Sequence, residues 1–203
     1  DNYRIGMGGG AVSSVNTGEY GNKIELNAVQ RSNPEMQKRV LNAIRGLVES
    51  DNNPIVSIHD HGAGGHLNCL SELVEETGGN IDMDALPIGD KTLSDREIVG
   101  NESQERMGLV LNSTDVDRLR KIADRERAPM YVVGRTTGDM NFTFSHKDGT
   151  RPIDWKLSDM FGNPPKTIMT DNTVSHKYAP VAYDQADIPT YIRQVMKLES
   201  VGC

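Results

Sequence analysis

The fold of this chain is decided within residues 54–76, which read PIVSIHDHGAGGHLNCLSELVEE. The apolar, β-branched residues 54–58 predict a strand, and glycines then separate it from a run with apolar residues at helical spacing. That run predicts a helix from about Gly64 to Glu76. A strand that passes directly into a helix is typical of folds that mix a sheet with helices, where ligands bind at the carboxyl ends of central strands. We expect 54–58 to be such a central strand.

Strands and helices alternate along the rest of the chain. Asn33 predicts the N-cap of one helix, and Ser94 with Glu97 forms a capping box that predicts the start of another. A turn at 148–149 predicts a hairpin, and hence antiparallel pairs in the sheet. The predicted fold class is therefore α+β, with a mixed sheet flanked by helices. Further strands are expected at 80–86, 107–111, 130–134 and 141–144, and further helices at 34–48, 114–127 and 188–198.

The composition argues against several classes of protein. The chain has 203 residues, which predicts one domain with an appendage, and we place these at 1–162 and 163–203. A net charge of −7 without a basic stripe predicts no nucleic-acid partner, and no apolar run reaches the roughly 18 residues of a membrane span. Two cysteines make no disulfide framework, which predicts a cytoplasmic location. Because the first residue is Asp1 rather than Met, we expect a piece of a longer polypeptide.

Three histidines and an aspartate cluster after the first strand. His59, Asp60, His61 and His66 fall within eight residues, which invites comparison with a zinc site. Successive residues of a strand point to opposite faces and alternate ones share a face, however, so Asp60 points away from His59 and His61. The nearby Cys69 lies on an apolar helix face and is expected to be buried. The histidines are better explained as polar residues that bond to backbone or water.

Asp60 has two readings that its position alone does not separate. It lies at the carboxyl end of a strand and is followed by glycines, which let a phosphate approach the backbone. Magnesium binds one or two carboxylates together with phosphate oxygens and water, so a single aspartate is sufficient for a site. The alternative is that Asp60 caps the helix that follows.

Two further polar or glycine-rich runs are candidate ligand sites. Gly8, Gly9 and Gly10 could surround a phosphate, although they match neither the dinucleotide fingerprint nor the P-loop, and such clusters are more often turns. The run 102–104, Glu-Ser-Gln, is either a solvated loop or a set of donors and acceptors for a ribose or an amide, and Gln30 could join it. No set of residues has the spacing of a catalytic nucleophile or base, so we predict no catalytic residue in this chain.

The motifs occur together in an order that resembles one family. GMGGGA at 6–11, VQRSNPEM at 29–36, HDHGAGG at 59–65, NESQER at 101–106 and RERAP at 125–129 follow one another along the chain. This set resembles the phosphoribosylformylglycinamidine synthases in their large single-chain form. The resemblance covers nearly the whole chain. Within that family the chain is similar to the second half of the first synthetase-like module, followed by the connector to the next module.

The resemblance implies a fold, a reaction and site residues. The fold would be that of the C-terminal domain of aminoimidazole ribonucleotide synthetase. The reaction would convert formylglycinamide ribonucleotide, glutamine and ATP into the amidine, with ammonia supplied by a glutaminase domain elsewhere in the parent chain. Asp60 resembles a magnesium ligand. Gln30, Glu102, Ser103 and Gln104 resemble ribonucleotide contacts, with Gly8, Gly9 and Gly10 as the candidate phosphate cradle.

The same resemblance leaves a second role open. The family's catalytic histidine, most nucleotide-binding residues and the glutaminase triad would lie outside this chain, so the piece alone is expected to be inactive. Large members of the family are built from pseudo-repeated halves. The alternative is therefore a structural half-module that pairs with another half-module and binds an auxiliary nucleotide or none.

Overall fold

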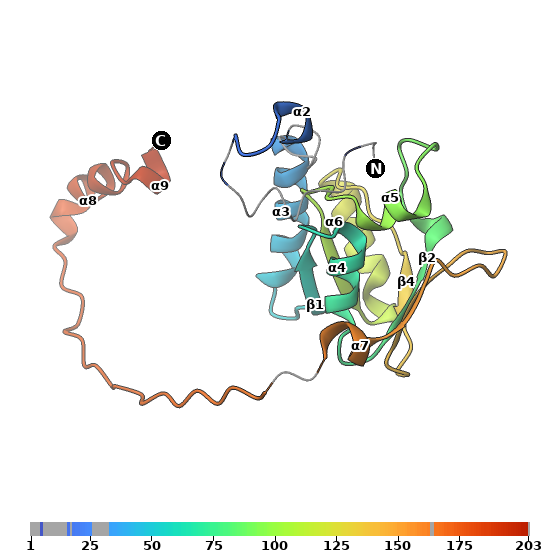
Figure 1. Ribbon diagram of the computed structural model, residues 1–203. Coiled ribbons are helices and arrows are strands. Elements are labelled where there is room, and N and C mark those ends of the chain that lie inside the picture. The colour runs from blue at the N-terminus through green and yellow to red at the C-terminus, as the bar shows by residue number, and fades with distance from the viewer. Residues whose placement is uncertain (1–4, 6–15, 17, 26–32, 163–164, 203) are drawn as a thin grey trace. The chain divides into compact units, whose positions relative to one another are not determined.

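The chain forms two compact units, residues 1–164 and 165–203 (Figure 1). The computed structural model describes residues 5, 16, 18–25, 33–162 and 165–202. The predicted glycine turn at 8–10, Gln30 and most of the segment before Asn33 lie outside these residues. The two units are described separately below.

The first strand pairs with a strand that lies far along the chain. β1 (Ile55–Asp60) and β3 (Met107–Leu111) form an antiparallel two-stranded sheet. Helix α4 (Gly65–Leu73) packs against both strands, and Figure 1 shows it beside β1. Gly108 of β3 is needed for this packing, because a Cβ there would lie 2.6 Å from Leu73 Cδ1. The predicted strands 54–58 and 107–111 are confirmed, and among the described residues β1 pairs with β3 alone, so a central position of 54–58 is not seen there.

A second sheet has four strands in the order β4-β2-β5-β6. β2 (Gly79–Asp82) runs parallel to β5 (Asn141–Ser145), whereas β4 (Gly134–Thr136) and β6 (Ile153–Lys156) are antiparallel to their neighbours. The predicted mixed sheet and α+β class are therefore confirmed. One face of this sheet supplies the core of the unit, with Ile81, Phe142 and Phe144 at most 4% exposed.

Two of the remaining helices begin where the sequence places caps. The Asn33 side chain accepts a hydrogen bond from the Met36 N–H at 3.0 Å and caps α3 (Pro34–Val48). Ser94 and Glu97 form the predicted capping box at the start of α5 (Asp95–Gly100). The other helical segments of this unit are α2 (Asn22–Glu25), the 3₁₀ turns η1 (Met83–Ala85) and η2 (Ser113–Asp115), α6 (Val116–Arg125) and α7 (Leu157–Phe161).

Three strand predictions need correction. The strand expected at 80–86 ends at Asp82, because the Asp82 side chain accepts from the Asp84 N–H at 2.9 Å and starts η1. Of the strand expected at 130–134, only Gly134 is in a strand, where a Cβ would lie 2.4 Å from the Asn80 carbonyl oxygen. β6 was not predicted, although Ile153 and Trp155 alternate with Asp154 and Lys156 and Ile153 is buried. It forms by pairing with β5 across the predicted turn.

The second unit, 165–203, is mostly extended. Residues 165–184 have no regular structure, and η3 (Gln185–Asp187), α8 (Ile188–Val195) and α9 (Glu199–Gly202) follow. The predicted helix 188–198 is therefore present but ends at Val195. In the part of the chain that the structure describes, no helix has the length and apolar character needed to cross a membrane.

Candidate functional site

The pairing of β1 with β3 places the two main motifs side by side. Asp60 lies opposite Met107 in the antiparallel register, and just beyond it the His61 N–H donates to the Arg106 carbonyl oxygen at 3.2 Å. The segment 101–106 therefore runs next to the segment 59–61. The candidate metal ligand, Asp60, and the candidate ribonucleotide contacts at 102–104 therefore lie on neighbouring backbone segments.

Asp60 lies on the exposed face of β1. Its side chain is 72% exposed, and its nearest charged partner among the described residues is the His59 ring, with Nδ1 3.7 Å from Asp60 Oδ1. The burial of β1 alternates between half-buried and exposed residues, which confirms that His59 and Asp60 face opposite ways. The capping reading is wrong, since Gly64 is the N-cap of α4 and no side chain bonds there. The Asp60 carboxylate is therefore available to a ligand.

The three histidines contact the backbone and other side chains. His59 Nδ1 lies 2.9 Å from the Asp60 carbonyl oxygen, and its Nε2 contacts the Glu72 carboxylate. His61 Nε2 lies 2.9 Å from His66 Nδ1, and the two buried rings meet edge to face. Within the described ranges, no three His, Cys, Asp or Glu side chains come together as metal ligands. The backbone contact predicted for His59 is present, whereas the His61–His66 pair was not predicted.

Burial keeps this histidine pair neutral. Desolvation, with the Arg106 charge as the next cause, lowers the pKa of His61 from 6.5 to about 4. Desolvation also lowers the pKa of His66 well below its usual value, and the neighbouring His61 adds to this. A neutral pair shares a single proton across its mutual hydrogen bond, so one outer nitrogen is a donor and the other an acceptor.

Glu102 and Ser103 are buried and Gln104 is half-buried, so the solvated-loop reading is wrong. Glu102 is 2% exposed and Ser103 is 1% exposed. The Gln104 Nε2 donates to Glu102 Oε1 at 2.6 Å. Glu102 Oε2 and Ser103 Oγ have no hydrogen-bond partner among the residues that the structure describes. Because buried polar atoms are nearly always hydrogen-bonded in folded proteins, to protein or to water, these two atoms are candidates to bond a water or a polar ligand.

The start of α4 packs closely against this polar run. Gly64 and Gly65 both have positive φ, and a Cβ at Gly65 would lie 2.2 Å from the Asn101 carbonyl oxygen. Only glycine permits this approach in this backbone conformation. The uncapped start of a helix presents backbone N–H groups and a partial positive charge, which suit an anionic ligand. The glycines predicted to let a ligand approach the backbone also allow two segments of the chain to meet.

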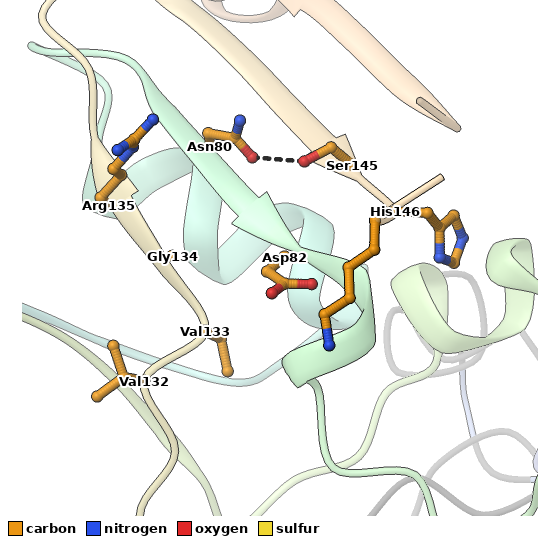
Figure 2. Close-up of a pocket in the computed structure, with 9 residues that line it drawn as sticks. Asn80, Asp82, Val132, Val133, Gly134, Arg135, Ser145 and His146 are labelled. Atoms are coloured by element: carbon orange, nitrogen blue, oxygen red, sulfur yellow. Dashed lines mark hydrogen bonds between the residues drawn. The ribbon is translucent and has the colours of Figure 1, made fainter. Parts of the chain in front are cut away.

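A separate hollow of about 400 Å³ lies at the carboxyl ends of β2 and β5 (Figure 2). Asn80 and Ser145 face one another in it, and Ser145 Oγ donates to Asn80 Oδ1 at 2.8 Å. No sequence pattern predicts this hollow, because Asn80 and Asp82 of β2 are distant along the chain from the other lining residues, 132–135 and 145–147. It is lined by Asn80, Asp82, 132–135 and 145–147.

Comparisons with known proteins agree on one family. A family model described as AIR synthase related protein, C-terminal domain, matches residues 2–147. The phosphoribosylformylglycinamidine synthase of Dictyostelium discoideum is 38% identical over 98% of this chain, and that of Saccharomyces cerevisiae is 39% identical over 98% of it. The chain spans only 16% and 15% of the lengths of these two relatives.

Solved structures share the fold. T. maritima PurL complexed with FGAR has a TM-score of 0.65 and 24% identity, and the match covers 87% of this chain and 29% of that chain. T. maritima PurL complexed with ATP has a TM-score of 0.58 and 21% identity, with coverage of 82% and 29%. Each of these proteins is much longer than the part matched here.

Proposed function

Because the chain belongs to the AIR synthase related family, as its C-terminal domain, we propose that it forms the ribonucleotide- and magnesium-holding part of a phosphoribosylformylglycinamidine synthase. The parent enzyme would convert formylglycinamide ribonucleotide, glutamine and ATP into the amidine in purine biosynthesis. The observation that carries this proposal is a pair of buried polar atoms, Glu102 Oε2 and Ser103 Oγ, that have no hydrogen-bond partner in the part of the chain that the structure describes. The names of the relatives and of the FGAR-complexed structure support it.

The buried run suits the polar parts of a ribonucleotide. A glutamate oxygen accepts hydrogen bonds and a serine hydroxyl both donates and accepts, so Glu102 and Ser103 could bind the hydroxyl groups of a ribose. Gln104 already holds one oxygen of Glu102, which fixes the direction of the other. Gln30 is proposed as a further contact, and Gly8, Gly9 and Gly10 as a phosphate cradle, on the family resemblance alone.

Asp60 is the residue that would hold magnesium. A lone exposed carboxylate fits this ion, which takes one or two carboxylates and completes its shell with phosphate oxygens and water. When bound, the ion supplies positive charge that offsets the charge of transferring phosphate oxygens. Asp60 would place that charge at the end of β1, next to the carboxyl end of the segment 101–106 that holds Glu102. ATP as co-substrate belongs to the same proposal, and PurL complexed with ATP supports it.

The test is the Asp60→Asn substitution in the full-length enzyme. We expect synthetase turnover to fall about 10- to 100-fold, the range typical when a group that tunes a metal site is removed. Glutaminase activity should stay normal, which shows that the enzyme is folded. Asp51→Asn, an exposed aspartate before β1, is the matched control and should leave both activities unchanged. Normal synthetase turnover in Asp60→Asn would refute the magnesium assignment.

A structural half-module is the second candidate, and one observation favours it. Val56 and Ile58, on the same face of β1 as Asp60, are 63% and 40% exposed, as expected of a face that another half-module covers. Under this alternative the chain would bind an auxiliary nucleotide or none. Titration of formylglycinamide ribonucleotide against the intact Gln104→Ala enzyme separates the two: weakened binding supports the first proposal, and unchanged binding supports the second.

The partners and location follow from the same proposal. We propose contacts with other domains of the parent chain, including a glutaminase domain, and no nucleic-acid or membrane partner. A cytoplasmic location rests on the cysteine content alone. A relative from Arabidopsis thaliana is named chloroplastic/mitochondrial, so imaging of the tagged full-length protein is the appropriate measurement.

A further inference from the structure

His146 bonds to two carboxylates that come from two different helical segments. It follows directly after β5, at the rim of the hollow in Figure 2. Its Nδ1 lies 2.9 Å from Asp84 Oδ1 in η1, and its Nε2 lies 3.2 Å from Asp95 Oδ2 at the start of α5. The Lys147 N–H donates to the second oxygen of Asp84 at 2.8 Å, so the end of β5 holds η1 at two points.

The second of these contacts acts on a helix that ends at the candidate site. α5 is short, and its final residue, Gly100, is followed at once by the buried run 101–104. Ile98 and Val99 anchor the end of α5 in the core. Its start is held by its own capping box and, from outside the helix, by the contact of His146 with Asp95.

We propose that His146 is a positioning residue, which holds the start of α5 and thereby fixes the direction in which α5 presents Glu102 and Ser103. The proposal deepens the proposed function, since it concerns the same buried polar run, and it rests on that function for its effect on the ribonucleotide. Its structural part, the tether between β5 and α5, rests on the contacts of His146 with Asp84 and Asp95.

Charge makes the tether dependent on pH. Hydrogen bonds to Asp84, and next to Asp95, raise the pKa of His146. The hydrogen bond between His146 and Asp84 also lowers the pKa of Asp84. The tether is therefore charge-assisted between the lowered pKa of Asp84 and the raised pKa of His146, and it weakens as pH rises through the latter. Besides these two carboxylates, the charged groups around His146 are Asp148 and Lys147 of its own turn, and Asp82 across the hollow.

The first readout is structural and uses the intact enzyme. We expect His146→Gln to raise hydrogen–deuterium exchange in the peptide 94–104 about twofold to fivefold at pH near 6, as suits the loss of a partly exposed ion pair. The wild-type exchange, corrected for intrinsic rates, should approach that of the variant as pH rises above the pKa of His146. Asp95→Asn should give a smaller rise in the same peptide. His176→Gln, an exposed histidine of the second unit, is the control and should change nothing.

The second readout is kinetic and separates this proposal from the proposed function. In His146→Gln the KM for formylglycinamide ribonucleotide should rise about twofold to fivefold, with little change in kcat and none in the KM for glutamine. Unchanged exchange of 94–104 in both His146→Gln and Asp95→Asn would overturn the tether, whatever the kinetics. Raised exchange with an unchanged KM would overturn the link from α5 to the ribonucleotide. Normal ribonucleotide affinity in Gln104→Ala would instead overturn the proposed function and leave the tether standing.

Discussion

The run 101–104 and the turn around His146 are both rich in polar side chains, yet they satisfy them differently. In the run, Glu102 and Ser103 are buried, and each has an oxygen without a partner among the described residues. In the turn, His146 and Thr150 are more exposed, and both have carboxylate partners within the chain. Buried polar atoms of folded domains are nearly always hydrogen-bonded. An atom without a partner inside the domain is therefore expected to bond a group from outside it, such as a water or a ligand. The first region therefore has polar atoms that a ligand could bond, whereas the polar side chains of the second region bond one another.

The two regions also respond to protons in opposite directions. Burial lowers the pKa of His61 beside the first region, so protonation favours the unfolded state there. Carboxylate partners raise the pKa of His146 in the second region, so protonation favours the folded state there. Protonation of His61 therefore destabilises the domain in acid, whereas protonation of His146 stabilises it. This contrast follows from whether the surroundings of the imidazole supply a counter-charge.

The largest effect should come from adding a methyl group where the two segments of the first region meet. Gly65→Ala places a Cβ 2.2 Å from the Asn101 carbonyl oxygen at a positive φ, and should lower the free energy of unfolding by about 3 kcal/mol or more. Gly149→Ala in the turn is the matched control: its φ is also positive, but no atom lies within 4 Å of the new Cβ. It should cost only about 1 kcal/mol. Equal losses in urea denaturation would contradict the close packing of α4 on this run.

Acid should weaken the first region by a similar amount. His61 is protonated near pH 6.5 in the unfolded chain but only near pH 4 when folded, and this difference corresponds to about 3 kcal/mol. The sign follows from proton uptake: stability falls as pH drops from about 6.5 to about 4 and then levels off for this group. Protection of the His61 amide, which donates to Arg106, should fall over the same window. His61→Gln should remove the part of that slope that belongs to His61 and leave the part that belongs to His66, whose pKa burial also lowers. An unchanged slope would contradict burial of a neutral His61 ring.

How far the sequence could anticipate these regions depends on whether a feature is local. The capping box at Ser94 and the strand 107–111 were predicted because their signals lie within a few consecutive residues. β6 was not, because its partner β5 defines it. Burial of Glu102 was also missed: a polar run looks solvated until another segment, here the start of α4, covers it. The sequence predicts Asp60 and the run 102–104 as site residues, but their proximity depends on the pairing of β1 with β3. Gln30 and Gly8–Gly10 lie outside the described residues.

A smaller effect, of unusual sign, is expected from removing the unpaired hydroxyl. Ser103→Ala deletes a buried oxygen that has no partner among the described residues, and should leave the free energy of unfolding unchanged or raise it by up to about 1 kcal/mol without ligand. The same substitution should weaken the binding of formylglycinamide ribonucleotide, because a ligand contact is lost. Denaturation with and without the ribonucleotide measures both. Destabilisation in its absence would mean that Ser103 serves the fold and not a ligand.

The smallest effect completes the comparison with a hydroxyl that is paired. Thr150 Oγ1 donates to Asp148 Oδ1 at 2.7 Å, and its backbone N–H donates to the same oxygen at 2.9 Å. Thr150→Ala removes only the first bond, in an exposed turn, and should cost no more than about 0.5 kcal/mol. Ribonucleotide affinity should not change. The Ser103 and Thr150 variants thus delete similar atoms with opposite expected patterns. If both lower stability and neither lowers affinity, the unpaired oxygen in the buried run is no sign of a ligand.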